Sequence, residues 1–315
     1  MIWVVGKNGM LGSQVCQTLT EKKIPFVATG HEVDICDYSA IENFVLSFKT
    51  NNYLISHKSG KCNDGKITWI INCAGFTDVE KSESYEGFEE ASKINEKGAL
   101  NIARLSRSNN IKLIHISSDF VFDGKSLVAY TEKSEKNPQT KYGLSKSLGE
   151  DAVTFSCNQY YIIRTSWLYG YNKSNFVYKI FEGLKTQSKL FVVDDQIGCP
   201  TFAKDLSCVI LEFIEKNENA RELVGKHSAP SYGVYNFCNK GSTSRFDFAC
   251  AIKKILLKTK KIDDNCELMS RKTSEDETKR PLNSVLDTRK IEMELGIKIP
   301  DWKKSLESFI KSKNF

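Results

Sequence analysis

The segment VVGKNGMLG, residues 4–12, constrains the fold of this chain more than any other part of the sequence. Gly6, Gly9 and Gly12 stand between an apolar run and a segment with helical periodicity. A turn this tight requires residues without a Cβ atom, because the backbone must approach a pyrophosphate at the N-terminus of the following helix. This strand–turn–helix context predicts nucleotide binding, although the GxxGxxG spacing does not tell which nucleotide is bound.

Short apolar runs alternate with amphipathic segments of helical length. The runs are β-branched or aromatic and too short for helices, so we predict buried strands at 2–5, 26–28, 68–74, 112–117, 160–165 and 189–193. Apolar residues at helical spacing predict the inner faces of three helices: Leu11, Val15 and Leu19; Ile94, Leu100, Ile102, Ala103 and Leu105; and Leu144, Leu148, Ala152 and Phe155. The alternation predicts an α/β protein with a Rossmann-like, doubly wound parallel sheet.

The alternation weakens past residue 166, which predicts a smaller α/β substrate-binding lobe interleaved with the sheet domain. Residues 49–66 are polar, contain glycines and have no steady period, so we predict a surface insertion there. Residues 258–282 are rich in charge, serine and threonine, and we predict a loop. We assign 1–165 with about 203–240 to the dinucleotide-binding Rossmann domain, and 166–202 with 241–315 to the substrate lobe.

The composition argues against several classes of function. The net charge of +6 is mild and spread along the chain, so no basic block points to nucleic acid. No apolar run reaches transmembrane length, and the first ten residues lack the charged region and cleavage site of a signal peptide. Ten cysteines without paired CxxC spacing and four scattered histidines are not a zinc pattern. We therefore expect a cytoplasmic protein with reduced thiols and no metal, membrane or nucleic-acid partner.

Tyr142 and Lys146, in YGLSKSLGE, stand four residues apart and therefore one turn apart on the same face of a predicted helix. A phenol holds its proton until about pH 10, and a neighbouring positive charge favours the phenolate. Lys146 supplies such a charge, and its ammonium could also bond the hydroxyls of a nicotinamide ribose. The pair therefore predicts proton transfer by Tyr142.

Ser117 ends the predicted strand at 112–117, and Ser118 and Asp119 follow it directly. A hydroxyl at the carboxyl end of a sheet strand lies where open α/β folds bind their ligands. It could hydrogen-bond a substrate carbonyl beside Tyr142. A glycine turn, a strand-end serine and a YxxxK pair in that order favour catalysis over ordinary packing.

The region after the second predicted strand bears on the choice between NADPH and NADH. In the common dinucleotide fingerprint, an acidic residue there bonds the 2′-hydroxyl of the adenosine ribose. Thr29, Gly30 and His31 stand where that acid is expected, and Lys7 and His31 could accept a 2′-phosphate. We expect NADPH to be preferred and NADH to be usable. An exposed loop histidine is the alternative interpretation of His31.

Together these motifs resemble the extended short-chain dehydrogenase/reductases and, within them, the dTDP-4-dehydrorhamnose reductases. The similarity runs nearly end to end, through GKNGMLG, INCAGFTDVEKSES, ISSDFVFDG, YGLSKSLGE, RTSWLYG, DDQIGCPT, RPLNSVLD and LGIKIPDWKKSLESF. The YxxxK pair is shared by the whole superfamily, whereas the DQIGCPT and RPLNS segments are more specific to this branch. The resemblance implies NAD(P)H-dependent reduction of the C4 ketone of dTDP-4-dehydro-6-deoxy-L-mannose to dTDP-L-rhamnose.

The resemblance also implies roles for individual residues. Tyr142 is the expected catalytic acid, Lys146 its ribose-binding partner and Ser118 the catalytic hydroxyl, with Ser117 a less favoured alternative. The expected cofactor-binding residues are Gly6, Lys7, Gly9, Met10, Leu11, Gly12, His31, Asp34, Ala74, Gly75, Phe76, Thr77, Tyr142 and Lys146. The expected substrate-binding residues are Ser118, Asp119, Trp167 and Arg280. A guanidinium matches phosphate geometry, so Arg280 is a candidate for the diphosphate or sugar, and a surface ion pair is the alternative.

The chain departs from the family pattern at several positions. Phe120 stands where the family often has tyrosine, so a hydrogen bond from that hydroxyl would be missing. Gln14 and Lys204 match the glutamates through which some members bind magnesium at a dimer interface. Because magnesium prefers hard oxygen ligands, we expect no magnesium requirement, no dimer of that type, and a monomer or weak homodimer.

Two alternative functions stay open. A nucleotide-sugar epimerase/reductase of the GDP-fucose synthase kind needs an additional acid/base pair, for which Cys199 is the only tempting thiol, and packing is the preferred interpretation of that residue. A non-catalytic NADP-binding regulatory subunit, like the β subunit of methionine adenosyltransferase, has a similar fold. The intact set of Ser118, Tyr142 and Lys146 argues against this second alternative.

Overall fold

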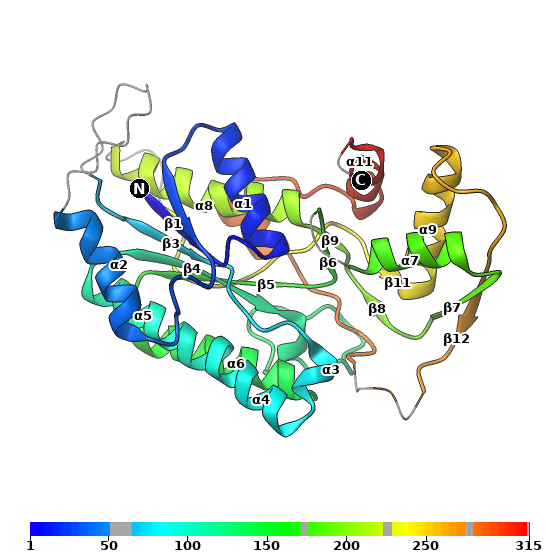
Figure 1. Ribbon diagram of the computed structural model, residues 1–315, viewed down its shortest axis with the longest axis horizontal. Coiled ribbons are helices and arrows are strands. Elements are labelled where there is room, and N and C mark those ends of the chain that lie inside the picture. Colours follow the sequence, from blue (N-terminus) through cyan, green and yellow to red (C-terminus); the bar gives the residue numbers. More distant parts are fainter. Residues whose placement is uncertain (51–64, 172–174, 223–228, 275–276, 278–279, 314) are drawn as a thin grey trace.

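A parallel sheet lies at the centre of the larger part of the molecule, and its strand order is β10-β5-β4-β3-β1-β2 (Figure 1). The computed structural model describes residues 1–50, 65–171, 175–222, 229–274, 277, 280–313 and 315, so most of the predicted insertion at 49–66 lies outside the described residues. The strands of this sheet are β1 (Ile2–Val5), β2 (Phe26–Thr29), β3 (Trp69–Asn72), β4 (Lys112–Ser118), β5 (Tyr160–Thr165) and β10 (Gly233–Asn236).

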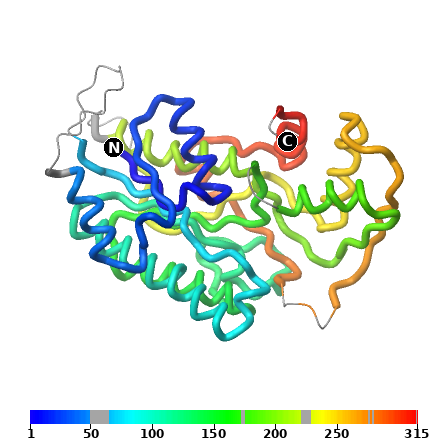
Figure 2. The backbone as a smooth tube through the Cα atoms, viewed as in Figure 1, coloured from blue at the N-terminus to red at the C-terminus, as the bar shows by residue number. Residues whose placement is uncertain are grey.

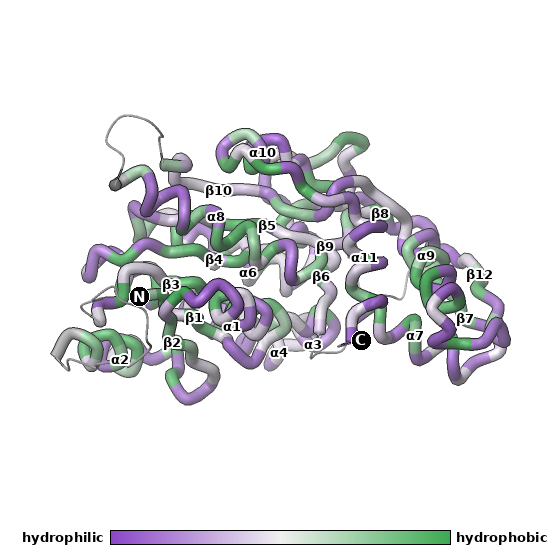
Figure 3. Tube along the Cα trace, turned by 90° about the horizontal axis from the view of Figure 1, so that it is seen from above, coloured by the Kyte–Doolittle hydropathy of each residue, from purple (hydrophilic) through white to green (hydrophobic). Residues whose placement is uncertain are grey.

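Helices cover both faces of this sheet, because successive strand residues point to opposite sides. Ile2 and Val4 of β1 pack with the helices of one face: α1 (Met10–Glu21), α8 (Ala203–Glu222) and α10 (Arg289–Leu295). Trp3 and Val5 pack with those of the other: α2 (Tyr38–Thr50), α5 (Ala99–Ser108) and α6 (Lys141–Ser156). In Figure 1 the sheet lies between these two layers, and Figure 3 shows apolar residues along its strands β1 and β3. The predicted α/β, doubly wound fold is confirmed.

The predicted inner face of α6 is wrong. Leu144 is 39% exposed and Phe155 is 83% exposed. Leu148 and Ala152 are only partly buried. The apolar periodicity of this helix therefore marks its outer side.

The buried face of α6 carries Tyr142, Lys146, Gly149 and Glu150 instead. The helix packs very closely there, because a Cβ atom on Gly149 would lie only 2.2 Å from the carbonyl oxygen of Asn95. Hydrophobic periodicity fails as a guide because this face forms one wall of a polar site rather than the apolar core.

A smaller lobe lies beside the sheet along the long axis of the molecule and has its own apolar core (Figure 2). Its helices are α7 (Phe176–Thr186), α9 (Arg245–Lys258) and α11 (Trp302–Lys311), and β7 (Lys189–Val193) pairs in parallel with β12 (Glu267–Arg271). Two further short pairs are β8 (Ile197–Gly198) with β11 (Thr243–Ser244), and β6 (Leu168–Tyr169) with β9 (Thr201–Phe202). Short helical elements are α3 (Val79–Ser82), α4 (Tyr85–Ser92), a π-helix η1 (Lys93–Gly98) and a 3-10 turn η2 (Asp119–Val121).

Two expectations for the lobe need correction. The strand at 189–193 is confirmed, but it lies outside the main sheet, and Phe191 is 55% exposed. The segment 258–282 is not a continuous loop, because β12 forms within it. The domain assignment stays a prediction, and α10, which belongs to the segment assigned to the lobe, packs against α8 and β10. None of the described helices is both long and apolar enough to span a membrane.

Candidate active site

A cavity of about 1600 Å³ opens at the carboxyl ends of the central strands, between the sheet and the smaller lobe. Doubly wound sheets bind ligands at this edge where the strand order reverses, which here is between β1 and β3. Small-molecule sites typically measure roughly 300–1,000 Å³. The cavity is therefore large enough for a dinucleotide and a second ligand together.

The glycine turn after β1 forms one end of this cavity. Gly6 has a φ angle of +84°, which L-residues with side chains rarely adopt, and a Cβ atom there would lie 2.7 Å from the backbone nitrogen of Ala74. A Cβ atom on Gly12 would lie 2.1 Å from the carbonyl oxygen of Gly6. The turn is thus packed too tightly for side chains, and it leaves the backbone exposed to a ligand at the N-terminus of α1. This cradle fits a dinucleotide pyrophosphate.

Most of the predicted cofactor-binding residues meet in the cavity. Its lining includes Gly6, Gly9, Met10, Leu11, His31, Asp34, Ala74, Gly75, Thr77, Tyr142 and Lys146. Lys7, Gly12 and Phe76 are not part of the lining. Gly12 acts through close packing, and the backbone nitrogen of Phe76 donates to the side chain of Asn95 at 2.9 Å.

Lys7 forms an ion pair with Glu32 rather than standing free for a phosphate. Hydrogen bonding from Lys7 lowers the pKa of Glu32 to about 2. Glu32 is the acidic residue after the second strand that we took to be absent, and it lies just past His31. A cation and a carboxylate therefore stand side by side next to the glycine turn.

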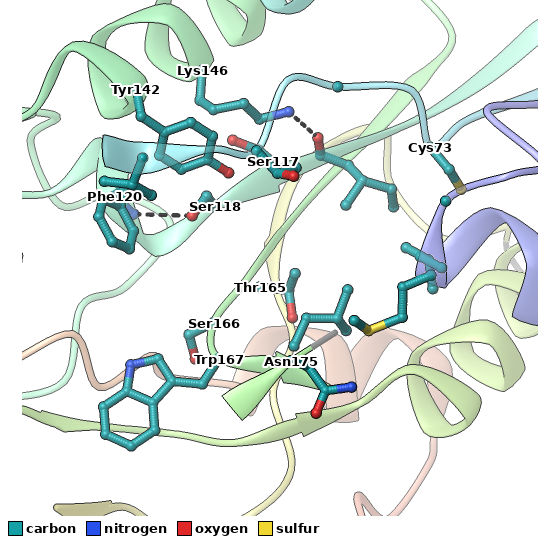
Figure 4. A pocket seen from close by; sticks show the side chains of 18 of the residues that line it. Cys73, Ser117, Ser118, Phe120, Tyr142, Lys146, Thr165, Ser166, Trp167 and Asn175 are labelled. Atoms are coloured by element: carbon teal, nitrogen blue, oxygen red, sulfur yellow. Dashed lines mark hydrogen bonds between the residues drawn. The ribbon is translucent and has the colours of Figure 1, made fainter. Parts of the chain in front are cut away.

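Tyr142 stands in the first turn of α6, where the Thr140 side chain caps the helix by accepting a hydrogen bond from Gly143 at 2.9 Å. Its phenol points towards Ser118 at the end of β4 (Figure 4). Phe120 packs its ring against the phenol ring, edge to face, with the two centroids 5.3 Å apart. Where the family often has a tyrosine hydroxyl, this chain therefore has an apolar wall that orients Tyr142.

Burial raises the pKa of Tyr142 to about 12, while a hydrogen bond with Ser118 lowers it and the charge of Asp119 raises it. This differs from our expectation that Lys146 favours the phenolate. Burial is the largest cause of the shift, and the causes of this shift do not include the charge of Lys146. The phenol therefore keeps its proton at neutral pH, as a general acid must.

Lys146 lies one turn further along α6, and its amine donates to the carbonyl oxygen of Ile116 at 2.6 Å. A Cβ atom on Gly75 would lie 3.8 Å from its nitrogen, which places the amine beside the turn after β3. Burial lowers the pKa of Lys146 to about 8, and the charge of Glu150 opposes that shift. The Lys146 amine is thus close to Gly75, which is one of the predicted cofactor-binding residues.

The two serines at the end of β4 have different partners. The hydroxyl of Ser118 donates to Asp119 at 2.9 Å and accepts from the backbone nitrogen of Phe120 at 3.2 Å. The hydroxyl of Ser117 donates to the carboxylate of Glu150 at 2.6 Å. Ser117 is thus bound to Glu150, and Ser118 is the hydroxyl that stands beside the phenol of Tyr142 (Figure 4). Burial raises the pKa of Asp119 to about 6.

Glu150 connects α6 to the two strands next to it, β4 and β5. Its carboxylate accepts two hydrogen bonds from the guanidinium of Arg164, at 2.8 and 2.7 Å, in addition to the one from Ser117. The side chains of Glu150 and Arg164 are 3% and 4% exposed. This buried pair ties α6 to the ends of β4 and β5.

Asn95 was not anticipated from the sequence. It lies in the π-helix η1, a feature that often marks functional sites. Its side-chain oxygen accepts from the nitrogen of Phe76, and its side-chain nitrogen donates to the carbonyl of Phe76 at 3.1 Å and to Ser145 at 2.9 Å. Asn95 therefore fixes the turn after β3 relative to α6.

The predicted substrate-binding residues Ser118, Asp119, Trp167 and Arg280 all line the cavity. Trp167 lies across it from Tyr142 and Ser118 (Figure 4). Its φ angle of +45° is unusual for a bulky residue, and such conformations often occur at functional sites. Arg280 forms an ion pair with Glu80 at 2.6 Å, and both residues line the cavity.

Three further residues singled out from the sequence do not line the cavity: Cys199, Gln14 and Lys204. Cys199 is buried with Cys238 in a small apolar cluster, which supports its interpretation as a packing residue. Gln14 is buried on α1, and Lys204 is exposed on α8. Within the part of the chain that the structure describes, no three histidine, cysteine, aspartate or glutamate side chains could hold a metal ion together.

Comparisons with known proteins agree with this geometry. A family model described as the RmlD substrate binding domain matches residues 1–315. The dTDP-4-dehydrorhamnose reductase of Aggregatibacter actinomycetemcomitans is 31% identical, over 97% of this chain and 96% of that protein. A crystal structure of a dTDP-4-dehydrorhamnose reductase from Clostridium acetobutylicum has a TM-score of 0.82 and 33% identity, over 98% of each chain. A structure of the Bacillus anthracis dTDP-4-dehydrorhamnose reductase in complex with NADP has a TM-score of 0.82 and 29% identity, again over 98% of each chain.

Proposed function

The chain belongs to the family of the RmlD substrate binding domain, and we propose from this that it is an NAD(P)H-dependent reductase of a dTDP-4-keto-6-deoxysugar. Its proposed reaction converts dTDP-4-dehydro-6-deoxy-L-mannose to dTDP-L-rhamnose. The observation that carries the proposal is the meeting of Tyr142, Ser118 and Lys146 in one cavity with the glycine turn after β1. Relatives named as dTDP-4-dehydrorhamnose reductases support the choice of substrate.

The proposed roles follow from the positions of the side chains. Ser118 and Tyr142 share one wall of the cavity, and both can donate to the carbonyl oxygen of a ketone once the Ser118 hydrogen turns from Asp119 to that oxygen. As negative charge develops on that oxygen, Tyr142 donates its proton to it, and the Ser118 hydroxyl stabilises it. The bound nicotinamide supplies the hydride. Lys146 lies beside the turn that contains Gly75. There it holds the ribose and stabilises the phenolate that Tyr142 becomes after it has donated its proton.

Both forms of the coenzyme are compatible with the residues beside the glycine turn. Lys7, once released from its ion pair with Glu32, offers a cation to a 2′-phosphate, whereas the Glu32 carboxylate offers an acceptor to a 2′-hydroxyl. The Bacillus anthracis relative was crystallised with NADP, which supports NADPH as the preferred coenzyme. We propose that NADH is also used, that the enzyme needs no magnesium, and that it acts as a monomer or weak homodimer.

The first test is oxidation of NADPH and NADH by the purified protein with a panel of dTDP-, UDP- and GDP-linked keto-sugars. We expect turnover with dTDP-4-dehydro-6-deoxy-L-mannose, and a higher kcat/KM with NADPH than with NADH. A strong preference for NADH would contradict the coenzyme assignment. Absence of turnover with every sugar would favour a non-catalytic subunit instead.

Substitution of Gly12 by alanine tests the coenzyme cradle. The new methyl group would overlap the carbonyl oxygen of Gly6, and relief of such overlap in a packed site costs about 1–3 kcal/mol. We expect NADPH to bind roughly 5- to 100-fold more weakly, as measured by fluorescence titration. Gln17→Ala is the matched control, because Gln17 is exposed on the same helix and does not line the cavity, so its NADPH affinity should equal that of the wild type. Equal affinity in the two variants would count against the cradle.

A further inference from the structure

Arg245 is the first residue of α9 and lines the cavity from the side of the smaller lobe. Its guanidinium lies 3.6 Å from the ring centroid of Trp167 and 5.0 Å from that of Phe176. These contacts hold the flat group against aromatic surface. Its N–H donors, which lie in the plane at its edge, are left for a polar partner.

Within the described part of the chain, the guanidinium of Arg245 has no ion pair with a carboxylate and no side-chain hydrogen bond. Burial lowers the pKa of Arg245, and the nearby charge of Arg280 lowers it further, against the opposing charge of Asp119. Arg280 is already paired with Glu80, whereas a half-buried Arg245 without a carboxylate partner is unfavourable unless an anion joins it. The arrangement therefore indicates a place for an anionic ligand.

The position of Arg245 relative to Tyr142 and Ser118 narrows the choice of anion that it could bind. Arg245 stacks on Trp167, which lies across the cavity from Tyr142 and Ser118 (Figure 4). Arg280 lines the same cavity. The coenzyme pyrophosphate has its own cradle at the glycine turn, so Arg245 is placed for a different anion, and the proposed nucleotide-sugar substrate brings one in its diphosphate.

We propose that Arg245, together with Arg280, binds the diphosphate of the nucleotide-sugar substrate. The guanidinium fork of Arg245 matches two phosphate oxygens, and Trp167 and Phe176 hold that fork in place before the substrate arrives. A diphosphate held there leaves the attached sugar to extend past Trp167 towards Ser118 and Tyr142. This proposal rests on the proposed function for the identity of the anion.

Titration calorimetry with dTDP, which carries the diphosphate but no reducible sugar, tests the proposal. Loss of hydrogen bonds to a charged group costs about 1.5–3 kcal/mol, so Arg245→Gln should weaken dTDP binding roughly 10- to 100-fold. The affinity for NADPH and the melting temperature should stay at wild-type values. In turnover assays, KM for the keto-sugar should rise while kcat stays close to that of the wild type.

Two further variants sharpen the result. Arg245→Lys keeps the charge but loses the fork, and it should recover only part of the dTDP affinity. Lys254→Gln removes an exposed charge from the same helix and should leave dTDP binding unchanged. The proposal is overturned if Arg245→Gln binds dTDP within twofold of the wild type, or if its affinity for NADPH falls in parallel.

These outcomes separate the proposal from the proposed reaction. If dTDP binding depends on Arg245 but no keto-sugar is reduced, the anion site stands and the reductase assignment fails. If the wild type reduces the keto-sugar and Arg245→Gln does so with unchanged KM, the reductase assignment stands and the anion site fails.

Discussion

Replacement of Tyr142 by phenylalanine is expected to lower kcat by ~100-fold or more, the usual scale of general acid catalysis. The variant keeps the ring that packs against Phe120 but has no proton to give to the developing alkoxide. Because burial raises the pKa of Tyr142 to about 12, the wild-type phenol is protonated throughout the neutral range, and the loss should be nearly independent of pH from 6 to 8.

Steady-state kinetics of NADPH oxidation measure this effect, and fluorescence titration should show that the NADPH affinity is almost unchanged. Tyr85→Phe is the matched control, because Tyr85 is 70% exposed on α4, and its kcat should equal that of the wild type. Full activity of the Tyr142→Phe enzyme would remove the basis for the proposed mechanism.

Replacement of Glu150 by glutamine is expected to lower the free energy of unfolding by about 3–5 kcal/mol, as when one partner of a buried ion pair is removed. The guanidinium of Arg164 would stay buried without a counter-charge, and Ser117 would lose the carboxylate to which it donates. Denaturation in urea measures the change. Asp151→Asn removes an exposed carboxylate of the same helix that pairs with Lys136, and it should cost no more than about 1 kcal/mol.

Glu150→Gln should also change the pH dependence of kcat/KM, which a purely structural role of Glu150 would leave unchanged. Glu150 raises the pKa of Lys146, which burial lowers to about 8. The Lys146 ammonium is present below this pKa and is lost above it, so kcat/KM should fall on the alkaline side of about pH 8. Without the charge of Glu150 this alkaline limb should move to lower pH. A stability equal to that of Asp151→Asn and an unmoved pH profile would together contradict the role given to Glu150.

The parts of the fold that could be predicted from the sequence are those where burial alone sets the pattern. The strands β1, β3, β4 and β5 are apolar runs buried on both faces, and α1 buries Leu11, Val15 and Leu19 as its spacing predicts. In α6 the same principle failed, because the buried face carries polar residues, Tyr142 and Lys146 among them, that line the cavity. β12 could not be foreseen, because its five residues gain their partner, β7, only in the folded lobe.

The residues of the candidate site also fall into those that could be predicted from the sequence and those that could not. Residues carried by local motifs, such as Gly6, Ser118 and Tyr142, line the cavity because each motif contains its own strand end or helix start. Arg245 and Asn95 were missed because they stand in no motif and gain their position from segments far away in the chain. Glu32 was missed because it stands just beyond the position where an acid is usually expected.

The most direct test of the account follows a single hydrogen atom. NADPH labelled with deuterium at C4 of the nicotinamide, in separate preparations for its two faces, is used to reduce dTDP-4-dehydro-6-deoxy-L-mannose, and the product is analysed by NMR. We predict that one of the two labels appears at C4 of the sugar, and that turnover in D₂O leaves C3 and C5 unlabelled. A product without deuterium at C4 from either preparation, or with solvent deuterium at C3 or C5, would contradict it.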